Sequence, residues 1–320
     1  MKQKIFIIAG LGLLLVILFF IMKDLFITGS DNKPNPYEYD LGRLKKSDSL
    51  FVGWKELTHF TCSLEEIHGI DIDPAGRICV SGKGGVEIFD ESGKIIQNFR
   101  VEGTARCIKT DTKGTIILGM EDHIELYDQN GKPLGKWKRE SGNSIITGIA
   151  VLQEEVFVAD AGEKTVYHYQ KSGKLINRIG DKDPQNNIPG FFIPSPYFDL
   201  GIDPSGGLWI ADPGRHTINK FSYNGKLISS WGKASMGVEG FCGCCNPSNF
   251  AFLSDGSFVT SEKSIERVKV YSSDGKYICL VATPGSFEEG TRGIDLAVDA
   301  KDRIFILDPV KKQVSIFVKK

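Results

Sequence analysis

Short apolar segments separated by polar turns run through most of the chain after residue 50. In the clearest copy, Phe198–Ile202 and Leu208–Asp212 are apolar and are joined by a turn of Asp, Pro, Ser and Gly, and another apolar segment follows at Ile218–Phe221. Short runs rich in Val, Ile, Phe and Tyr, bounded by Gly, Asp and Asn, are typical of β-strands. The pattern predicts an all-β domain built from a repeated unit of strands.

Five copies of a three-residue turn that ends in Gly-Lys mark the repeat. Each copy follows a short apolar strand and precedes another one. The glycines of these turns lie 38, 42, 52 and 50 residues apart, at Gly93, Gly131, Gly173, Gly225 and Gly275. Glycine supplies the positive φ that a tight hairpin turn needs. A repeat of this length is typical of propellers, in which each unit is one blade.

Six segments begin a blade, and the sixth blade has only three strands before the chain ends. The segments are Gly69–Asp73, Cys107–Asp111, Thr147–Val151, Phe198–Asp203, Asn249–Leu253 and Asp295–Asp299. The apolar segment Leu50–Leu57 precedes the first blade and can supply the missing strand. Such closure protects the sheet edges. We therefore expect a six-bladed β-propeller over residues 49–320, whose last blade is completed by an N-terminal strand.

The fourth copy, with Leu208-Trp209-Ile210-Ala211-Asp212 followed by Ile218, Phe221 and Gly225-Lys226, resembles the NHL repeat. The fifth copy departs from it, because Ser261-Glu262 replaces the Ala-Asp ending. The resemblance implies a propeller fold and says little about chemistry. Some NHL-like propellers are lyases that hold zinc through several histidines. The five histidines here show no recognisable ligand spacing: His59, His68, His123, His168 and His216.

The N-terminus has a different composition. Ile5–Met22 is an unbroken run of 18 uncharged residues without proline, and the apolar character extends to Ile27. We expect a transmembrane signal anchor over residues 5–27, long enough to span a bilayer. Because Lys2 and Lys4 precede it, residues 1–4 form a cytoplasmic stub and the propeller lies outside the cytoplasm, in the periplasm or at the cell surface. Residues 28–48 are a polar linker. A cleaved signal peptide is the alternative.

Charge argues against nucleic acid as a partner. The chain has 39 Lys and Arg against 40 Asp and Glu, a net charge of −1, and the two signs are mixed along the sequence. Proteins that bind nucleic acid usually carry a basic patch or stripe. The expected partners are instead the membrane, through residues 5–27, and a protein or small molecule on the propeller.

One face of the propeller is expected to carry the function. The loops within blades and the loops between blades meet on this loop face, and the two longest, 181–197 and 232–248, flank the fourth blade. Long loops on a rigid scaffold are where binding usually resides. The sequence therefore predicts a binding region over the fourth and fifth blades.

Three of the seven cysteines fall in the run Cys242-Gly243-Cys244-Cys245. Thiolates suit zinc, copper or an iron–sulfur centre, with His216 or Cys107 as a fourth ligand. Disulfide chemistry is a second reading, since the expected compartment permits it. Packing of small buried thiols is a third. The spacing leaves all three open.

Aligned blade starts place a second set of polar residues beside the central channel. Asp199, Asn249 and Asp295 occupy equivalent positions on three consecutive blades and can hold a cation, a ligand or a chain of water. Near the same rim lie three basic side chains, which favour an acidic ligand: His68, Arg106 and Arg292. Simple hydration of the channel is the alternative for both sets.

The leading prediction is a membrane-anchored propeller that binds a protein or small ligand on its loop face, with a metal-binding or redox-active cysteine loop. One alternative is a metal-dependent lyase or hydrolase that uses the same face. Another is a plain interaction scaffold stapled by disulfides. The sequence has no Gly-x-Ser-x-Gly, His-Glu-x-x-His or phosphate-binding motif. It therefore names no catalytic residue and favours binding over catalysis.

Overall fold

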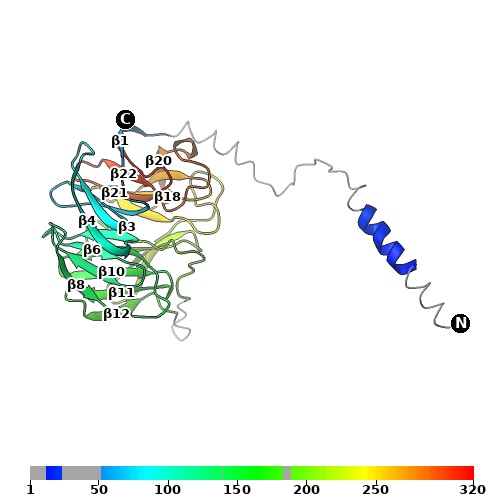
Figure 1. Ribbon diagram of the computed structural model, residues 1–320, viewed down its shortest axis with the longest axis horizontal. Helices are drawn as coiled ribbons and strands as arrows, with labels where there is room; N and C mark the ends of the chain where they lie inside the picture. The colour runs from blue at the N-terminus through cyan, green and yellow to red at the C-terminus, as the bar shows by residue number, and fades with distance from the viewer. Residues whose placement is uncertain (1–11, 24–51, 139, 183–188) are drawn as a thin grey trace. The chain divides into compact units, whose positions relative to one another are not determined.

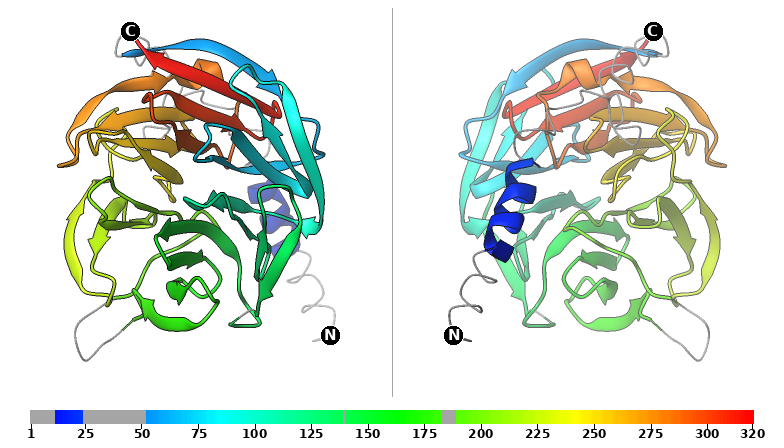
Figure 2. Two further views of the ribbon diagram at one scale, coloured as in Figure 1. Left: turned by 90° about the vertical axis from the view of Figure 1, so that its left-hand side faces the viewer. Right: turned by 90° about the vertical axis from the view of Figure 1, so that its right-hand side faces the viewer.

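The computed structural model describes residues 12–23, 52–138, 140–182 and 189–320. The chain divides into two units, with the boundary between Leu41 and Gly42. In the second unit, antiparallel β-sheets are arranged around a ring (Figures 1 and 2). Over the described ranges there are six sheets, five with four strands and one with three. The all-β, six-bladed propeller is therefore confirmed.

The first three blades follow one another along the chain. The first contains β2 (Ile67–Ile72), β3 (Ile78–Phe89) and β4 (Ile95–Thr104). The second contains β5 (Cys107–Thr110), β6 (Ile116–Gly119), β7 (Ile124–Tyr127) and β8 (Pro133–Trp137). The third contains β9 (Ile146–Leu152), β10 (Glu155–Asp160), β11 (Thr165–Gln170) and β12 (Leu175–Ile179).

The last three blades complete the ring. The fourth contains β13 (Leu200–Ile202), β14 (Leu208–Asp212), β15 (Thr217–Phe221) and β16 (Leu227–Trp231). The fifth contains β17 (Asn249–Phe252), β18 (Phe258–Glu262), β19 (Arg267–Tyr271) and β20 (Tyr277–Ala282), and the short helix η2 (Pro284–Ser286) follows it. The sixth contains β21 (Asp295–Val298), β22 (Ile304–Asp308), β23 (Gln313–Lys319) and the N-terminal strand β1 (Trp54–Thr61).

Strand β1 closes the ring as the sequence predicts. It pairs antiparallel with β23, from Trp54 opposite Lys319 to Thr61 opposite Gln313. The two strands lie side by side in both views of Figure 2, as a blue and a red arrow. Trp54 is 4% exposed and belongs to the apolar cluster between the fifth and sixth blades, which also includes Phe317. The sixth blade is thus built from both ends of the propeller.

The Gly-Lys turns have the backbone that their sequence predicts. All five glycines have φ between 79° and 88°. At Gly173, an added Cβ would lie 2.7 Å from the Trp137 ring, so the turn packs directly against the outer strand of the preceding blade. Any other residue there would meet both a backbone penalty and a steric clash.

The first blade has three strands where the other blades have four, because β3 includes the segment 82–85. The pairing of β3 with β4 starts within this segment, at Lys83 opposite Thr104 and Gly85 opposite Arg100. Gly84 within this segment has φ +80°. Residues 78–82 pair with β2, and residues 83–89 pair with β4. Ile78 and Phe89 lie in one core cluster and Cys79 and Ile88 in another, as expected when the chain turns between the two halves of β3.

Apolar residues at equivalent positions of the inner strands are buried. Ile70, Ile108, Leu200, Phe250 and Leu296 are each 4–6% exposed. Their side chains alternate with the channel-facing residues, as the period of two along a strand requires. The core lies between successive blades, so each inner strand has one face in the core and one toward the channel. This alternation positions the site described below.

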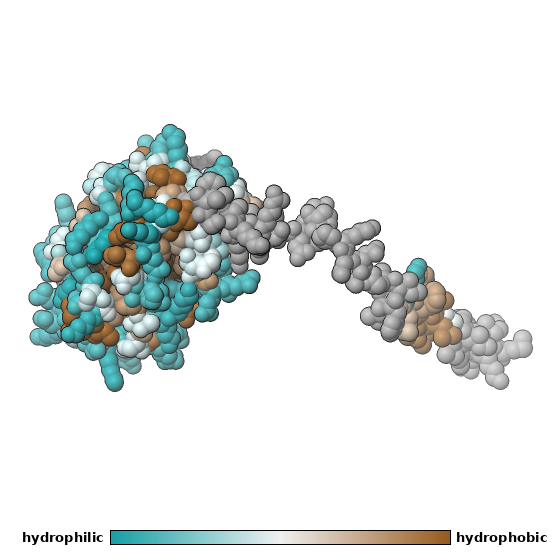
Figure 3. All heavy atoms as spheres, turned by 90° about the horizontal axis from the view of Figure 1, so that it is seen from above, coloured by the Kyte–Doolittle hydropathy of each residue, from teal (hydrophilic) through white to brown (hydrophobic). Residues whose placement is uncertain are grey.

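The N-terminal unit is described only at residues 12–23, which form a helix. Its residues are exposed and almost uniformly hydrophobic (Figure 3). Within the described part of the chain, no helix combines the length and the hydrophobicity that crossing a membrane requires. The predicted stub 1–4, the linker 28–48 and the remainder of the segment 5–27 lie outside the described residues. The anchor stays a prediction.

Candidate functional site

The channel of the propeller contains three adjoining cavities. We call the one at the loop face the upper cavity; it has a volume of about 260 Å³. The middle cavity, of about 60 Å³, shares His68, Arg106 and Asn249 with it. The lower cavity, of about 210 Å³, shares Lys109 with the middle one. Because neighbouring cavities share lining residues, they follow one another as one path along the channel.

All six residues that the sequence proposes for ligand binding line this path. The upper cavity is lined by His68, Arg106, Asn249 and Arg292. The middle cavity adds Asp199 and Asp295. The structure thus brings the set together, but around the channel axis and not over the fourth and fifth blades, where the loop lengths placed the functional region. The long loop 181–197, of which residues 183–188 are not described, contributes Pro196 and Tyr197.

The carboxylates of the inner strands have a structural role. Asp199 accepts a hydrogen bond from the backbone N–H of Phe250 at 2.9 Å, and Asp295 accepts one from Ile70 at 2.9 Å. In each case the donor lies on the inner strand of the next blade. These bonds tie successive blades together around the channel. They explain why acids stand at equivalent positions on different blades.

Burial also changes the protonation of these acids. Burial, together with the charge of Asp295, raises the pKa of Asp199 to about 8. Burial raises the pKa of Asp295 to about 6. Since both values lie far above the usual range of a carboxylic acid, the middle cavity retains a proton near neutral pH. A protonated Asp199 can donate a hydrogen bond to a group in the channel.

Lys109 lies below these acids and belongs to the same polar set. Its Nζ is 2.6 Å from Asp71 Oδ1, and Asp71 also accepts the N–H of Thr110 at 2.7 Å. Burial opposes the charge of Lys109, but the carboxylate of Asp71 raises the pKa of this lysine. The lower end of the channel therefore holds a compensated ion pair.

The upper cavity has a basic rim. Arg106 Nη2 is 3.6 Å from Glu121, and His68 Nε2 is 3.3 Å from Glu66. Arg292 has no ion pair with any carboxylate in the described ranges. Burial lowers the pKa of His68, and Glu66 opposes this shift while the charge of Arg106 reinforces it. Neutral His68 and two guanidinium groups thus surround one cavity.

Two buried polar atoms around the upper cavity have no hydrogen-bond partner among the residues that the structure describes. They are Nε of Arg106 and Oδ1 of Asn249. An unsatisfied buried polar group costs roughly 1–3 kcal/mol and is rare in native proteins. Two such atoms on one cavity indicate a site that is completed by a polar ligand or by water.

Lys263 and Tyr197 extend this site, and the sequence analysis missed both. The Nζ of Lys263 lies 4.6 Å from the centre of the Tyr197 ring and 2.9 Å from the Ser195 hydroxyl. Lys263 is only 8% exposed. Since Tyr197 lines the upper cavity, this buried cation adds to the positive side of the site.

The cysteine run divides into two parts. Cys242 is buried, and its backbone N–H donates to Glu262 Oε1 at 3.2 Å while its sulfur lies 3.8 Å from Arg267. Burial and Glu262 raise the pKa of this thiol to about 11. Cys244 and Cys245 instead contact each other, with 3.2 Å between their sulfur atoms. The three thiols therefore have different partners.

The structure does not bring together the five candidate metal ligands, Cys242, Cys244, Cys245, His216 and Cys107. Across the described ranges, no group of three or more His, Cys, Asp or Glu side chains is placed to hold a metal ion. Cys242 contacts Glu262 and Arg267, and Cys107 lines the middle cavity on the second blade. The expected zinc, copper or iron–sulfur centre therefore gains no support from the geometry.

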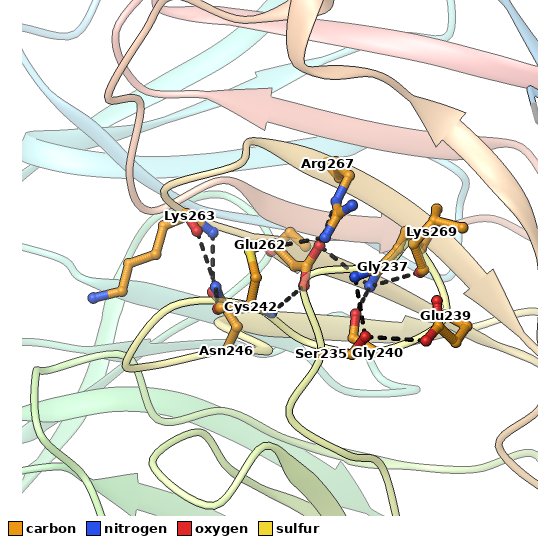
Figure 4. A network of polar contacts seen from close by, with 12 residues as sticks. Ser235, Gly237, Glu239, Gly240, Cys242, Asn246, Glu262, Lys263, Arg267 and Lys269 are labelled. Carbon is orange, nitrogen blue, oxygen red and sulfur yellow. Dashed lines mark hydrogen bonds and ion pairs between the residues drawn. The ribbon is translucent and has the colours of Figure 1, made fainter. Parts of the chain in front are cut away.

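A buried charge network holds the base of the cysteine loop (Figure 4). Glu262 Oε2 is 2.7 Å from Arg267 Nε and 3.2 Å from Lys269 Nζ, and all three side chains are fully buried. Lys269 also donates to the carbonyl of Gly240 at 2.6 Å. Burial lowers the pKa of Lys269 to about 8, against the opposing effect of Glu262. The network fixes residues 240–242 on the fifth blade.

No family model and no curated protein sequence matches this chain. The NHL resemblance therefore stays a prediction.

Solved structures share the fold. A streptogramin B lyase has a TM-score of 0.58 at 12% identity, covering 82% of this chain and 97% of its own. A virginiamycin B lyase from Staphylococcus aureus has a TM-score of 0.59 at 10% identity, covering 83% of this chain and all of its own. The WD40 β-propeller domain of Doa1 has a TM-score of 0.54 at 11% identity, covering 79% of each chain. At such identities the likeness shows the propeller fold alone.

Proposed function

We propose that this protein is a membrane-anchored, NHL-like propeller that binds a small organic anion at the loop-face mouth of its channel. Residues 5–27 hold it in the membrane and the propeller lies outside the cytoplasm. The observation that carries the binding proposal is the upper cavity, which is lined by Arg106 and Arg292 and where Nε of Arg106 and Oδ1 of Asn249 have no partner among the described residues.

The charges around the cavity favour an anion. Arg292 has no carboxylate partner in the described ranges, and the partner of Arg106, Glu121, is 64% exposed and 3.6 Å away. An exposed ion pair of this kind contributes little and is easily exchanged. Guanidinium groups bind carboxylates and phosphates through paired, charge-assisted hydrogen bonds. Both arginines are therefore available to a ligand.

The volume favours a small ligand. The upper cavity, of about 260 Å³, is just below the range of about 300–1,000 Å³ that drug-sized ligands occupy. A di- or tricarboxylate or a phosphate of similar size fits this space. Asn249 and protonated Asp199 can then bind the hydroxyl groups of such a ligand, because both lie deeper in the channel.

Replacement of Arg292 by Ala is expected to weaken anion binding by about 10- to 100-fold, since a hydrogen bond to a charged group contributes roughly 1.5–3 kcal/mol. The measurement is titration calorimetry of the full chain in detergent with a panel of carboxylates and inorganic phosphate. Arg100 is an exposed arginine on β4, and its replacement by Ala is the matched control, which should leave the affinity unchanged.

Anion binding should tighten as pH falls through the lowered pKa of His68, because the charged imidazolium attracts an anion.

Two results would overturn the proposal for the anion site. One is that no anion in the panel binds the wild-type protein. The other is that Arg292→Ala and Arg106→Ala bind with the affinity of the wild type.

Deletion of residues 1–29 is expected to release the propeller from membranes without changing its melting temperature, because the predicted anchor lies wholly in this segment. The full chain should sediment with membranes and resist a high-salt wash, and protease added to intact cells should cleave the propeller. A mature N-terminus after residue 27 would show that the segment is a cleaved signal peptide and would contradict the anchor.

A further inference from the structure

Cys244 and Cys245 form a close pair of thiols of unequal exposure. Their sulfur atoms are 3.2 Å apart, Cys244 is exposed and Cys245 is 1% exposed. A solvent-exposed thiol can meet a reagent directly, and a buried neighbour in contact with it can act only through that first thiol. The two positions therefore suit two different steps of one reaction.

The loop around the pair is held in place on both sides. Gly243, before it, has φ +74°, a conformation that glycine adopts without penalty. Asn246, after it, donates to the carbonyl of Lys263 at 2.9 Å and accepts the N–H of Lys263 at 2.9 Å. Its own N–H donates to the carbonyl of Pro213 at 3.2 Å. The thiol contact is thus a fixed feature of the fold.

The third cysteine of the run is engaged elsewhere. Cys242 has its N–H on Glu262 and its sulfur beside Arg267, and both of these side chains are fully buried (Figure 4). The reactive unit is therefore the adjacent pair and excludes Cys242.

We propose that Cys244 and Cys245 are a reversible thiol–disulfide site whose co-reactant is a low-molecular-weight disulfide. The Cys244 thiol loses its proton and its sulfur attacks one sulfur of the co-reactant. That bond breaks and one small thiol leaves with a proton, which gives a mixed disulfide on Cys244. The Cys245 thiol then loses its proton and attacks the Cys244 sulfur, which expels the second small thiol. Two protein thiols are oxidised and one disulfide is reduced to two thiols.

The disulfide between Cys244 and Cys245 is easily reduced. Neighbouring Cα atoms are about 3.8 Å apart, which is shorter than the usual 4.4–6.8 Å across a disulfide. Strained and exposed disulfides are readily reduced and serve regulatory or catalytic roles, whereas structural staples resist reduction. A bond between Cys244 and Cys245 therefore acts as a switch. The inference is independent of the proposed anion site, although Lys263 adjoins both.

The test is reaction of the reduced full chain with oxidised glutathione, followed by alkylation and tryptic mapping. Trypsin releases residues 234–263 as one peptide that contains Cys242, Cys244 and Cys245 and no other cysteine. We expect the loss of two thiols per chain, a peptide lacking two hydrogens, and alkylation confined to Cys242. Full recovery of all three thiols by a dithiol reductant should follow.

Single replacements separate the two steps. Cys245→Ser should stop at a stable glutathione adduct on Cys244, because no second thiol resolves it, and Cys244→Ser should not react. Cys279 is a half-buried cysteine outside the loop. Its replacement by Ser is the matched control and should react as the wild type does. Three results would overturn the proposal: alkylation of both Cys244 and Cys245 after treatment, a bond that includes Cys242, or an adduct on Cys245 in Cys244→Ser.

Discussion

Deletion of β1 (Trp54–Thr61) is expected to remove most of the stability of the propeller, lowering the free energy of unfolding by at least about 4 kcal/mol. Trp54 is 4% exposed in the cluster between the fifth and sixth blades, and loss of a buried tryptophan alone costs roughly 3–5 kcal/mol. The deletion also exposes the whole hydrogen-bonding edge of β23. Since domains have only about 5–15 kcal/mol in total, the loss is decisive.

Urea unfolding of the full chain and of the deletion variant measures this effect. Leu57→Ser is the matched control, because Leu57 lies on β1 but is 57% exposed, and its replacement should change stability by no more than about 0.5 kcal/mol. A synthetic peptide of residues 52–61 should restore part of the loss by pairing with β23. An unchanged unfolding midpoint in the deletion variant would show that the ring does not depend on β1.

The closure of the ring by β1 could be predicted because it follows from the number of strands in the repeats. Five Gly-Lys turns and six blade starts leave one blade a strand short, and Leu50–Leu57 is an apolar segment without a place of its own. The same repetition places Asp199 and Asp295 at equivalent positions, and in the structure both line the middle cavity. Their hydrogen bonds to the next blade could not be predicted, since they depend on how neighbouring inner strands are spaced.

Contacts between loops could not be predicted from the sequence. Lys263 reaches Ser195 and Tyr197 across 68 and 66 positions of the chain, and no periodic signal links the two loops. The cysteine run was recognised by its density, but the density could not show that Cys242 belongs to one set of contacts and the pair Cys244–Cys245 to another. Direction of side chains in an irregular loop depends on its turns, which here include the left-handed Gly243.

The buried charge network of the fifth blade has a recognisable pattern in the sequence. Glu262 stands where the fourth blade has Asp212. Arg267 and Lys269 are charged, whereas uncharged residues are expected in a buried strand. Their alternation along β19 places both cations on one face, and the register puts Arg267 opposite Glu262. One acid and two bases on adjacent buried strands indicate a charge network.

Replacement of Glu262 by Gln is the second change with a large expected effect, a loss of about 3–5 kcal/mol in the free energy of unfolding. Glu262 Oε2 is 2.7 Å from Arg267 and 3.2 Å from Lys269, and all three side chains are fully buried. Removing the negative charge of Glu262 takes this carboxylate away from two fully buried cations, which is far more costly than losing an exposed pair.

Urea unfolding again provides the measurement, with Glu154→Gln as the control. Glu154 pairs with Lys113 at 2.9 Å, but both side chains are about 70% exposed, so this change should cost less than about 1 kcal/mol. Adding Lys269→Met to Glu262→Gln should recover part of the loss, because it removes one of the two buried cations that Glu262 contacts. Equal effects of Glu262→Gln and Glu154→Gln would contradict a special role for the buried network.

The pH dependence of the Glu262→Gln variant gives an independent check. Burial already lowers the pKa of Lys269 to about 8, and Glu262 opposes that shift, so the variant should have a still lower value. Between this value and the higher pKa of the unfolded chain, the unfolded state binds more protons and stability rises with pH. In the wild type the same rise begins near pH 8, the pKa of its Lys269. The deficit of the variant should therefore shrink as pH rises from the variant's lowered pKa to about 8, and stay constant above that. Faster alkylation of Cys242 in the native variant should accompany the deficit, because the charge of Glu262 helps to raise the pKa of that thiol.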